Sequence, residues 1–233
     1  MTPRTILAVG AHIGDMDLAA GPVLAQNVLD GGRSVLLALT PGERGHPRMS
    51  IDDYRQQKID EAHSFAAGIG AEIIVYDDIS DGFLTADDDV AARLARDIRA
   101  IRPELLLSHW PRSIHRDHEQ ASLAADRARF LAGLPGWEES DTAEGSRHGV
   151  GRVLRTENWE DAEGFSATAY VAIEDEARRR WREAIAGQAF ARGETYGFRY
   201  IDYYDAQLTT RGALARVPAA VALADAEPRV EAL

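Results

Sequence analysis

Two short stretches of the sequence combine histidine with aspartate in patterns that could bind a metal ion or transfer protons. Residues 11–17 read Ala-His-Ile-Gly-Asp-Met-Asp, and residues 115–118 read His-Arg-Asp-His. The first stretch follows an apolar run, so a strand would deliver its imidazole and carboxylate at the carboxyl end. Taken alone, each stretch also has a structural interpretation. The first could be a tight turn with an aspartate that caps the next helix, and the second could be the start of a surface helix.

A metal site is the chemistry that uses both stretches together. His12, Asp15 and His118 would give two nitrogens and one oxygen to a divalent cation and leave a position open for water, as a catalytic zinc ion requires. The chain has no cysteine, which excludes thiolate ligands and disulfides. His115 lies three residues before His118, so a helical turn would place both imidazoles on one face. One can then bind the metal while the other faces a substrate.

Apolar runs alternate with helical patterns along the chain, and this alternation predicts an α/β fold with a parallel sheet. In a sheet of order 3-2-1-4, the first and fourth strands flank the crevice where ligands bind. The two histidine stretches follow these two strands, so we expect them to converge. The expected strands are residues 5–9, 34–39, 73–76, 105–108, 152–156 and 169–173, and the expected helices are residues 17–30, 52–67, 90–101, 118–131 and 175–191.

The remaining segments carry weaker patterns. Residues 133–151 contain few aliphatic side chains and are predicted to form a lid or mobile loop within one domain of residues 1–233. Residues 195–233 are expected to be a helical and aromatic extension, in which the aromatic residues 196–204 favour packing or subunit contact over a substrate platform. The tail from Pro218 is expected to be loosely held.

Composition narrows the classes of partner. The chain has 233 residues and is 45% hydrophobic, enough for a substantial core, and its net charge of -12 argues against nucleic acid or an anionic membrane as partner. No apolar stretch approaches the ~18 residues of a membrane span, and the first strand is too short for a signal peptide. We therefore expect a cytoplasmic protein that acts on a small molecule, and the aromatic C-terminal region favours a homo-oligomer.

The paired motifs resemble those of the PIG-L/LmbE-like zinc-dependent deacetylases, which remove N-acyl groups from amino sugars and related small molecules. Residues 11–17 are similar to the family's A-H-P-D-D-x-E and residues 115–118 to its H-P-D-H, while residues 39–43 and 156–159 also look like family segments. The resemblance spans about residues 5–190. It implies a Rossmann-like three-layer sandwich with a mostly parallel central sheet.

The resemblance also implies roles for individual residues. One zinc ion per chain would be held by His12, Asp15 and His118. In amide hydrolysis a protonated His115, oriented by Asp117, would stabilise the tetrahedral oxyanion.

The first motif departs from the family at the position of the general base. Gly14 stands where the family has the aspartate that deprotonates the zinc-bound water, and a positioned base contributes about 10²–10⁴-fold to rate. Asp17, Glu43, Asp117 or a carboxylate of the substrate could replace it. We favour Glu43, because its loop follows the second strand at the same edge of the sheet. The residues expected to contact substrate are Asp17, His109 and Trp110.

Three functions fit these residues. The leading one is a zinc amidohydrolase of the N-deacetylase type. The second is a catalytically weak or inactive metal-dependent binding protein on the same fold, which the glycine at position 14 motivates. The third is a non-haem iron oxygenase, since two histidines and one carboxylate also form that triad. Its usual scaffold is all-β, which the alternating pattern disfavours.

Overall fold

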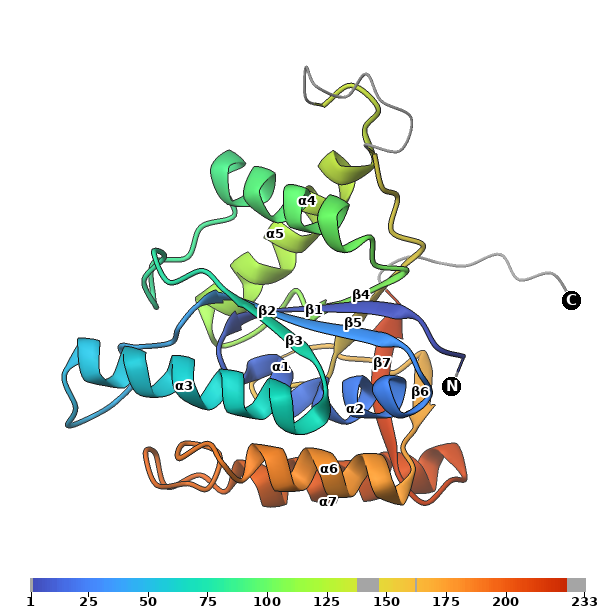
Figure 1. The fold of residues 1–233 in the computed structure, drawn as a ribbon. Helices are drawn as coiled ribbons and strands as arrows, with labels where there is room; N and C mark the ends of the chain where they lie inside the picture. The colour runs from blue at the N-terminus through green and yellow to red at the C-terminus, as the bar shows by residue number, and fades with distance from the viewer. Residues whose placement is uncertain (1, 138–146, 162, 226–233) are drawn as a thin grey trace, which may run out of the picture.

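A seven-stranded sheet organises the computed structural model, which describes residues 2–137, 147–161 and 163–225 (Figure 1). The strands are β1 (Thr5–His12), β2 (Arg33–Thr40), β3 (Glu72–Val75), β4 (Leu105–His109), β5 (Arg152–Thr156), β6 (Ala169–Ala172) and β7 (Ala220–Asp225). Their order is β3-β2-β1-β4-β5-β7-β6. Strands β1 to β5 pair in parallel, and β7 is antiparallel to both β5 and β6. The predicted 3-2-1-4 order is therefore confirmed.

Helices cover both faces of the sheet. The helices are α1 (Asp15–Ala19), α2 (Gly21–Leu29), α3 (Ile51–Ile69), α4 (Asp88–Ile101), α5 (Arg116–Gly133), α6 (Asp175–Ile185) and α7 (Tyr200–Ala215). Figure 1 shows α4 and α5 on one face and the other helices on the opposite face. Alternate residues of β1 enter two separate cores, Ile6 and Ala8 on the side of α2 and α6, and Leu7 and Val9 on the side of α4 and α5. This arrangement confirms the predicted α/β sandwich with a mostly parallel sheet.

The helix after the first histidine stretch is split in two. The sequence predicted one helix over residues 17–30, with a late start or a bend at Pro22. Instead α1 ends at Ala19, and Pro22 lies in the first turn of α2, where its missing N–H costs no hydrogen bond.

The segment 220–225 corrects the expectation of a loosely held tail. It forms β7, which lies between β5 and β6 and is buried over Ala220–Ala224. Its small and aliphatic side chains suit an inner strand, but they include no polar alternation that would have identified one. Of the predicted mobile loop, residues 138–146 lie outside the described residues, and α5 continues to Gly133.

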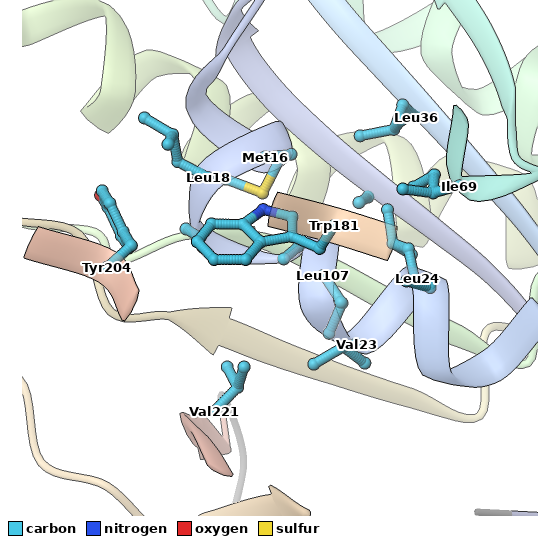
Figure 2. Close-up of a cluster of buried hydrophobic side chains, with 14 of the residues drawn as sticks. Met16, Leu18, Val23, Leu24, Leu36, Ile69, Leu107, Trp181, Tyr204 and Val221 are labelled. Atoms are coloured by element: carbon cyan, nitrogen blue, oxygen red, sulfur yellow. The ribbon is translucent and has the colours of Figure 1, made fainter. Parts of the chain in front are cut away.

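A buried tryptophan fixes α1 against the rest of the fold. Trp181 in α6 has no exposed surface, and its Nε1 donates a hydrogen bond to the carbonyl oxygen of Asp17 at 2.8 Å. Figure 2 shows the indole beside Met16 and Leu18, within a cluster that also contains Leu24. The C-terminal half of the chain thus holds the helix that follows the first histidine stretch.

None of the helices in the described residues has the length and apolar character that a membrane crossing requires.

Candidate metal centre and active-site cavity

The two histidine stretches meet at the carboxyl ends of β1 and β4. His12 is the last residue of β1, and His118 lies in the first turn of α5, which follows β4. The centroids of the two imidazole rings are 5.3 Å apart, although the residues are distant in sequence. Adjacent parallel strands that end at one edge of the sheet bring the two rings together.

Asp15 lies between these two histidines with a spacing that suits a metal ion. Its Oδ2 is 3.3 Å from His12 Nδ1 and 3.4 Å from His118 Nε2. A tetrahedral zinc ion with bonds of roughly 2.0–2.1 Å holds its ligand atoms about 3.3 Å apart. Asp15 Oδ2 therefore lies at the spacing of zinc ligands from one nitrogen of each histidine, as the predicted site of His12, Asp15 and His118 requires.

The second nitrogen of each of these histidines faces a carboxylate. His12 Nε2 lies 3.1 Å from Asp81 Oδ1 and 3.4 Å from Asp117 Oδ2. His118 Nδ1 lies 3.3 Å from Glu160 Oε2. Metal-binding histidines commonly donate their other N–H to a carboxylate, which fixes the tautomer and the ring orientation. This pattern leaves His12 Nδ1 and His118 Nε2 for a cation.

Other combinations of side chains in the described residues could also hold a metal ion. They are His12 with His115 and His118, Asp15 with His109 and His118, and His12 with Asp81 and Asp117.

The local charges are strongly coupled. Burial alone would raise the pKa of Asp15, but the charges of His118 and His12 hold it well below its ordinary value. Burial opposes protonation of His12, yet Asp15 and the hydrogen bonds to carboxylates raise its pKa well above the usual range. Burial and the neighbouring His118 lower the pKa of His109 to about 4. The opposite shifts of Asp15 and His12 thus describe an ionised carboxylate paired with the His12 ring.

The turn between His12 and Asp15 depends on Gly14. Its φ of 108° favours glycine, and the turn lets the backbone N–H of His12 donate to Asp15 Oδ2 at 2.7 Å. Phe190 packs against the bare Cα, because a Cβ at residue 14 would lie 2.3 Å from the ring. From the neighbouring helix α3, Lys58 Nζ donates to the carbonyl oxygen of Ile13 at 2.5 Å. The space of the family's general base is therefore filled by an aromatic ring.

A cavity of about 400 Å³ is lined by the candidate metal ligands His12, Asp15 and His118. Its polar lining comes from both histidine stretches, the loop after β3 and the segment after β5, and its aromatic lining comes largely from residues 190–204. The lining residues are His12, Ile13, Asp15, Leu18, Gly42, Gly45, Lys58, Asp81, His115, His118, Asn158, Trp159, Glu160, Phe190, Tyr196, Tyr200 and Tyr204.

His115 lines the cavity and is oriented by the backbone of Asp117. Its Nδ1 accepts the backbone N–H of Asp117 at 3.2 Å, which caps α5 and leaves Nε2 to carry the ring hydrogen. The carboxylate of Asp117 instead accepts the backbone N–H of Gly82 at 2.7 Å and faces His12. Burial and the charges of His12 and His118 lower the pKa of His115. These shifts favour a neutral imidazole over the protonated one that the sequence suggested.

Glu43, the favoured replacement base, lies outside the cavity lining. It is 1% exposed, and its carboxylate accepts hydrogen bonds from Ser80 Oγ at 2.5 Å and from the backbone N–H of Asp81 at 3.3 Å. Arg55 lies 3.6 Å away as an ionic partner. These contacts make Glu43 a support for the loop that carries Asp81.

The three residues expected to contact substrate are not among the cavity lining. Asp17 is 2% exposed and His109 is fully buried. His109 Nε2 accepts the backbone N–H of Ala11 at 3.0 Å, and its ring stacks on His118 with centroids 4.1 Å apart. Trp110 donates its indole N–H to the carbonyl oxygen of Glu163 at 2.7 Å. His109 thus packs against His118, and the backbone of Asp17 is held by Trp181.

Sequence reasoning missed Asp81, Glu160 and Phe190, and it underrated the aromatic stretch, since Tyr196 and Tyr200 line the cavity. Asp81 lies in the loop after β3, at the edge of the sheet where β1 ends with His12. This position at the same edge was the available signal. Nothing in the local sequence marks Phe190.

Comparison with known proteins assigns the family. Residues 7–129 match the family described as PIG-L: GlcNAc-PI de-N-acetylase, more than half of the chain. The resemblance inferred from the two motifs is therefore confirmed.

The matched relatives differ from one another in their named activity. Over 151 residues, 61% of this chain and 58% of the relative, the chain is 29% identical to 4-oxalmesaconate hydratase of Pseudomonas putida. Over 204 residues, 74% of this chain and 66% of the relative, it is 29% identical to 1D-myo-inositol 2-acetamido-2-deoxy-alpha-D-glucopyranoside deacetylase 2 of Catenulispora acidiphila. The matches thus span less than two thirds of either relative. The solved structure of GalB, the 4-carboxy-2-hydroxymuconate hydratase of Pseudomonas putida KT2440, has the same fold, with a TM-score of 0.86, 24% identity and 98% of each chain covered.

Proposed function

The chain belongs to the PIG-L family, and we propose that it is a metal-dependent hydrolase that removes an N-acyl group, acetyl in the first instance, from a small polar metabolite such as an amino sugar. The observation that carries this proposal is that Asp15 Oδ2 lies 3.3 Å from His12 Nδ1 and 3.4 Å from His118 Nε2, with all three residues in the cavity lining. A deacetylase among the matched relatives supports the reaction class.

We assign the metal to His12, Asp15 and His118, with zinc as the ion that this donor set suits. When bound, zinc supplies a coordinated water with a pKa of about 7 and polarises the acyl oxygen. Asp81 and Asp117 face the outer nitrogen of His12, and Ser113 and Glu160 face that of His118, so these contacts orient the two imidazoles.

His115 and Asp81 supply the proton chemistry in this proposal. His115 presents its Nε2 hydrogen to the acyl oxygen, where negative charge develops during attack. Asp81 lines the cavity as an ionised carboxylate, since His12 lowers its pKa against the opposing effect of burial. We place Asp81 as the acceptor of the water's proton, in the role that residue 14 cannot fill. Glu43 holds the Asp81 backbone.

A second candidate is a hydratase, which adds water across a carbon–carbon double bond. The observation that favours it is the loss of the base at residue 14, whose space Phe190 occupies. A hydratase among the matched relatives supports this candidate.

The test separates these reactions on one preparation. Zinc-loaded protein is incubated with N-acetylated sugars and aminocyclitols, and amine release is measured; loss of ultraviolet absorbance is followed with unsaturated carboxylic acids. Amine release that disappears in His118→Ala supports the hydrolase. Absorbance loss without amine release supports the hydratase. Zinc-dependent ligand binding with neither reaction supports the binding protein and contradicts both enzymes.

A further inference from the structure

One ammonium group lies in the wall of the cavity, buried and with no carboxylate of the described residues within ion-pair distance. It belongs to Lys58 of α3, which is the only lysine in the sequence and is 5% exposed. Among the residues that the structure describes, no aspartate or glutamate forms an ion pair with it. Buried ammonium groups are usually paired, because a charge removed from water without a partner costs free energy.

The hydrogen-bonding capacity of Lys58 is also largely unused. An ammonium has three N–H donors. One of them reaches the carbonyl oxygen of Ile13, and no other acceptor in the described residues bonds to Nζ. Two aromatic faces also lie close, with Nζ 4.1 Å from the centroid of Phe190 and 5.9 Å from that of Tyr54. Rings attract the charge but do not replace oxygen acceptors.

Lys58 stands close to the candidate metal centre. Ile13, to which it bonds, lies between the two ligands His12 and Asp15, and all of these residues line the same cavity. Phe190, which Lys58 faces, is the ring that fills the space beside Gly14. The carboxylates that act on Lys58 electrostatically, those of Asp15, Asp17, Glu61 and Asp81, lie beyond ion-pair distance of Nζ.

We propose that the substrate carries a carboxylate that binds Lys58 Nζ while the reacting group lies at the metal centre. This inference rests on the proposed function, because it takes the cavity to be the active site. It selects N-acylated acids over neutral amino sugars for the hydrolase, and unsaturated carboxylic acids for the hydratase. Lys58 is then a specificity-determining residue for either reaction.

Matched pairs of probes test this proposal by binding alone. The pairs are N-acetyl-D-glucosaminuronic acid with N-acetyl-D-glucosamine, N-acetylglycine with N-acetylglycinamide, and fumarate with fumaramide. Calorimetry on zinc-loaded protein should give at least one acid that binds roughly tenfold or more tightly than its neutral partner, as a charge-assisted hydrogen bond predicts. The preference should disappear in Lys58→Met and persist in Lys58→Arg.

The single lysine provides a readout on the unaltered protein. With lysine labelled at Nζ with ¹⁵N, the chain gives one side-chain resonance, which the preferred acid should shift and its neutral partner should not. The proposal is overturned if no acid outbinds its partner, if the preference survives in Lys58→Met, or if a tightly bound acid leaves the resonance unmoved. Deacylation of a neutral amide with no acid preference would overturn this inference and leave the hydrolase standing. An acid that binds Lys58 without being turned over would support this inference and count against the proposed reaction.

Discussion

The ring of Phe190 occupies the space into which a side chain at Gly14 would project. A Cβ at Gly14 would lie 2.3 Å from Cζ and 2.8 Å from Cε1 of that ring. Because Phe190 is 6% exposed and belongs to the same core cluster as Trp181, the ring cannot leave without opening a void. The packing of Phe190, which is distant in sequence, therefore leaves no room for a side chain at residue 14.

We predict that Gly14→Asp alone will destabilise the fold and will not raise deacetylase activity above that of the wild type. The new side chain meets Phe190 and requires a positive φ, so the variant should lose roughly 1–3 kcal/mol of unfolding free energy. Phe190→Ala should lose about 3–5 kcal/mol. The double variant should lose clearly less than the sum of the two, since each change relieves the other. Urea denaturation measures this coupling, and strictly additive losses would show that the two residues do not compete for space.

Asp81→Asn should lower kcat by about 10²–10⁴-fold if Asp81 accepts the proton. Because Asp81 also faces His12 Nε2, zinc affinity should fall by roughly 10–100-fold as well, so kcat is measured at saturating zinc. Glu43→Gln, which alters only the support of that loop, should have the smaller effect on kcat. Steady-state kinetics beside a zinc titration checks both. An Asp81→Asn enzyme of normal kcat would remove Asp81 from the mechanism.

Glu160→Gln should weaken zinc binding by roughly 10–100-fold, because it removes the carboxylate charge beside His118 Nδ1. Glu163→Gln is the matched control, since that side chain is exposed and, among the described residues, forms an ion pair with Arg112 at 3.7 Å. Competition with a chromophoric chelator gives both affinities. Equal affinities in the two variants would argue against an orienting role for Glu160.

Asp161 should contribute stability that is lost as pH rises between about 4 and 7. Burial raises the pKa of Asp161 from 3.8 to about 7. In this range Asp161 holds a proton in the folded protein that it has lost in the unfolded chain, so this contribution to the free energy of unfolding decreases as pH rises. The slope is at most about 1.4 kcal/mol per pH unit, and partial solvent exposure makes it smaller. Asp161→Asn should flatten this dependence, whereas the exposed Asp77→Asn should not. Urea denaturation at pH 4 to 8 measures this dependence. If the wild type and Asp161→Asn showed the same change of unfolding free energy with pH, Asp161 would not be its cause.

The sequence predicted the parallel half of the fold because its signals are local. Unbroken apolar runs marked β1, β2 and β4, and the order of strands placed His12 near His118. Strand β7 escaped prediction, because a short run of Ala, Val and Leu is equally consistent with a packed tail.

The parts of the site that could not be predicted come from long-range packing. Phe190 reaches Gly14, and Glu160 reaches His118, across separations that no local pattern encodes. Glu43 was selected for its place at the correct edge of the sheet, but Ser80 and Arg55 hold its carboxylate away from the cavity. The homo-oligomer expected from the aromatic stretch stays a prediction.

Zinc binding to metal-free protein tests the central claim most directly. Isothermal titration calorimetry of the wild-type chain should give one zinc ion per chain. His12→Ala and His118→Ala should each weaken binding by more than about 100-fold, beyond the effect of an outer carboxylate, while His115→Ala should stay within about tenfold of the wild type. Equal losses in all three variants, or a wild-type chain that binds no zinc, would contradict the metal centre proposed here.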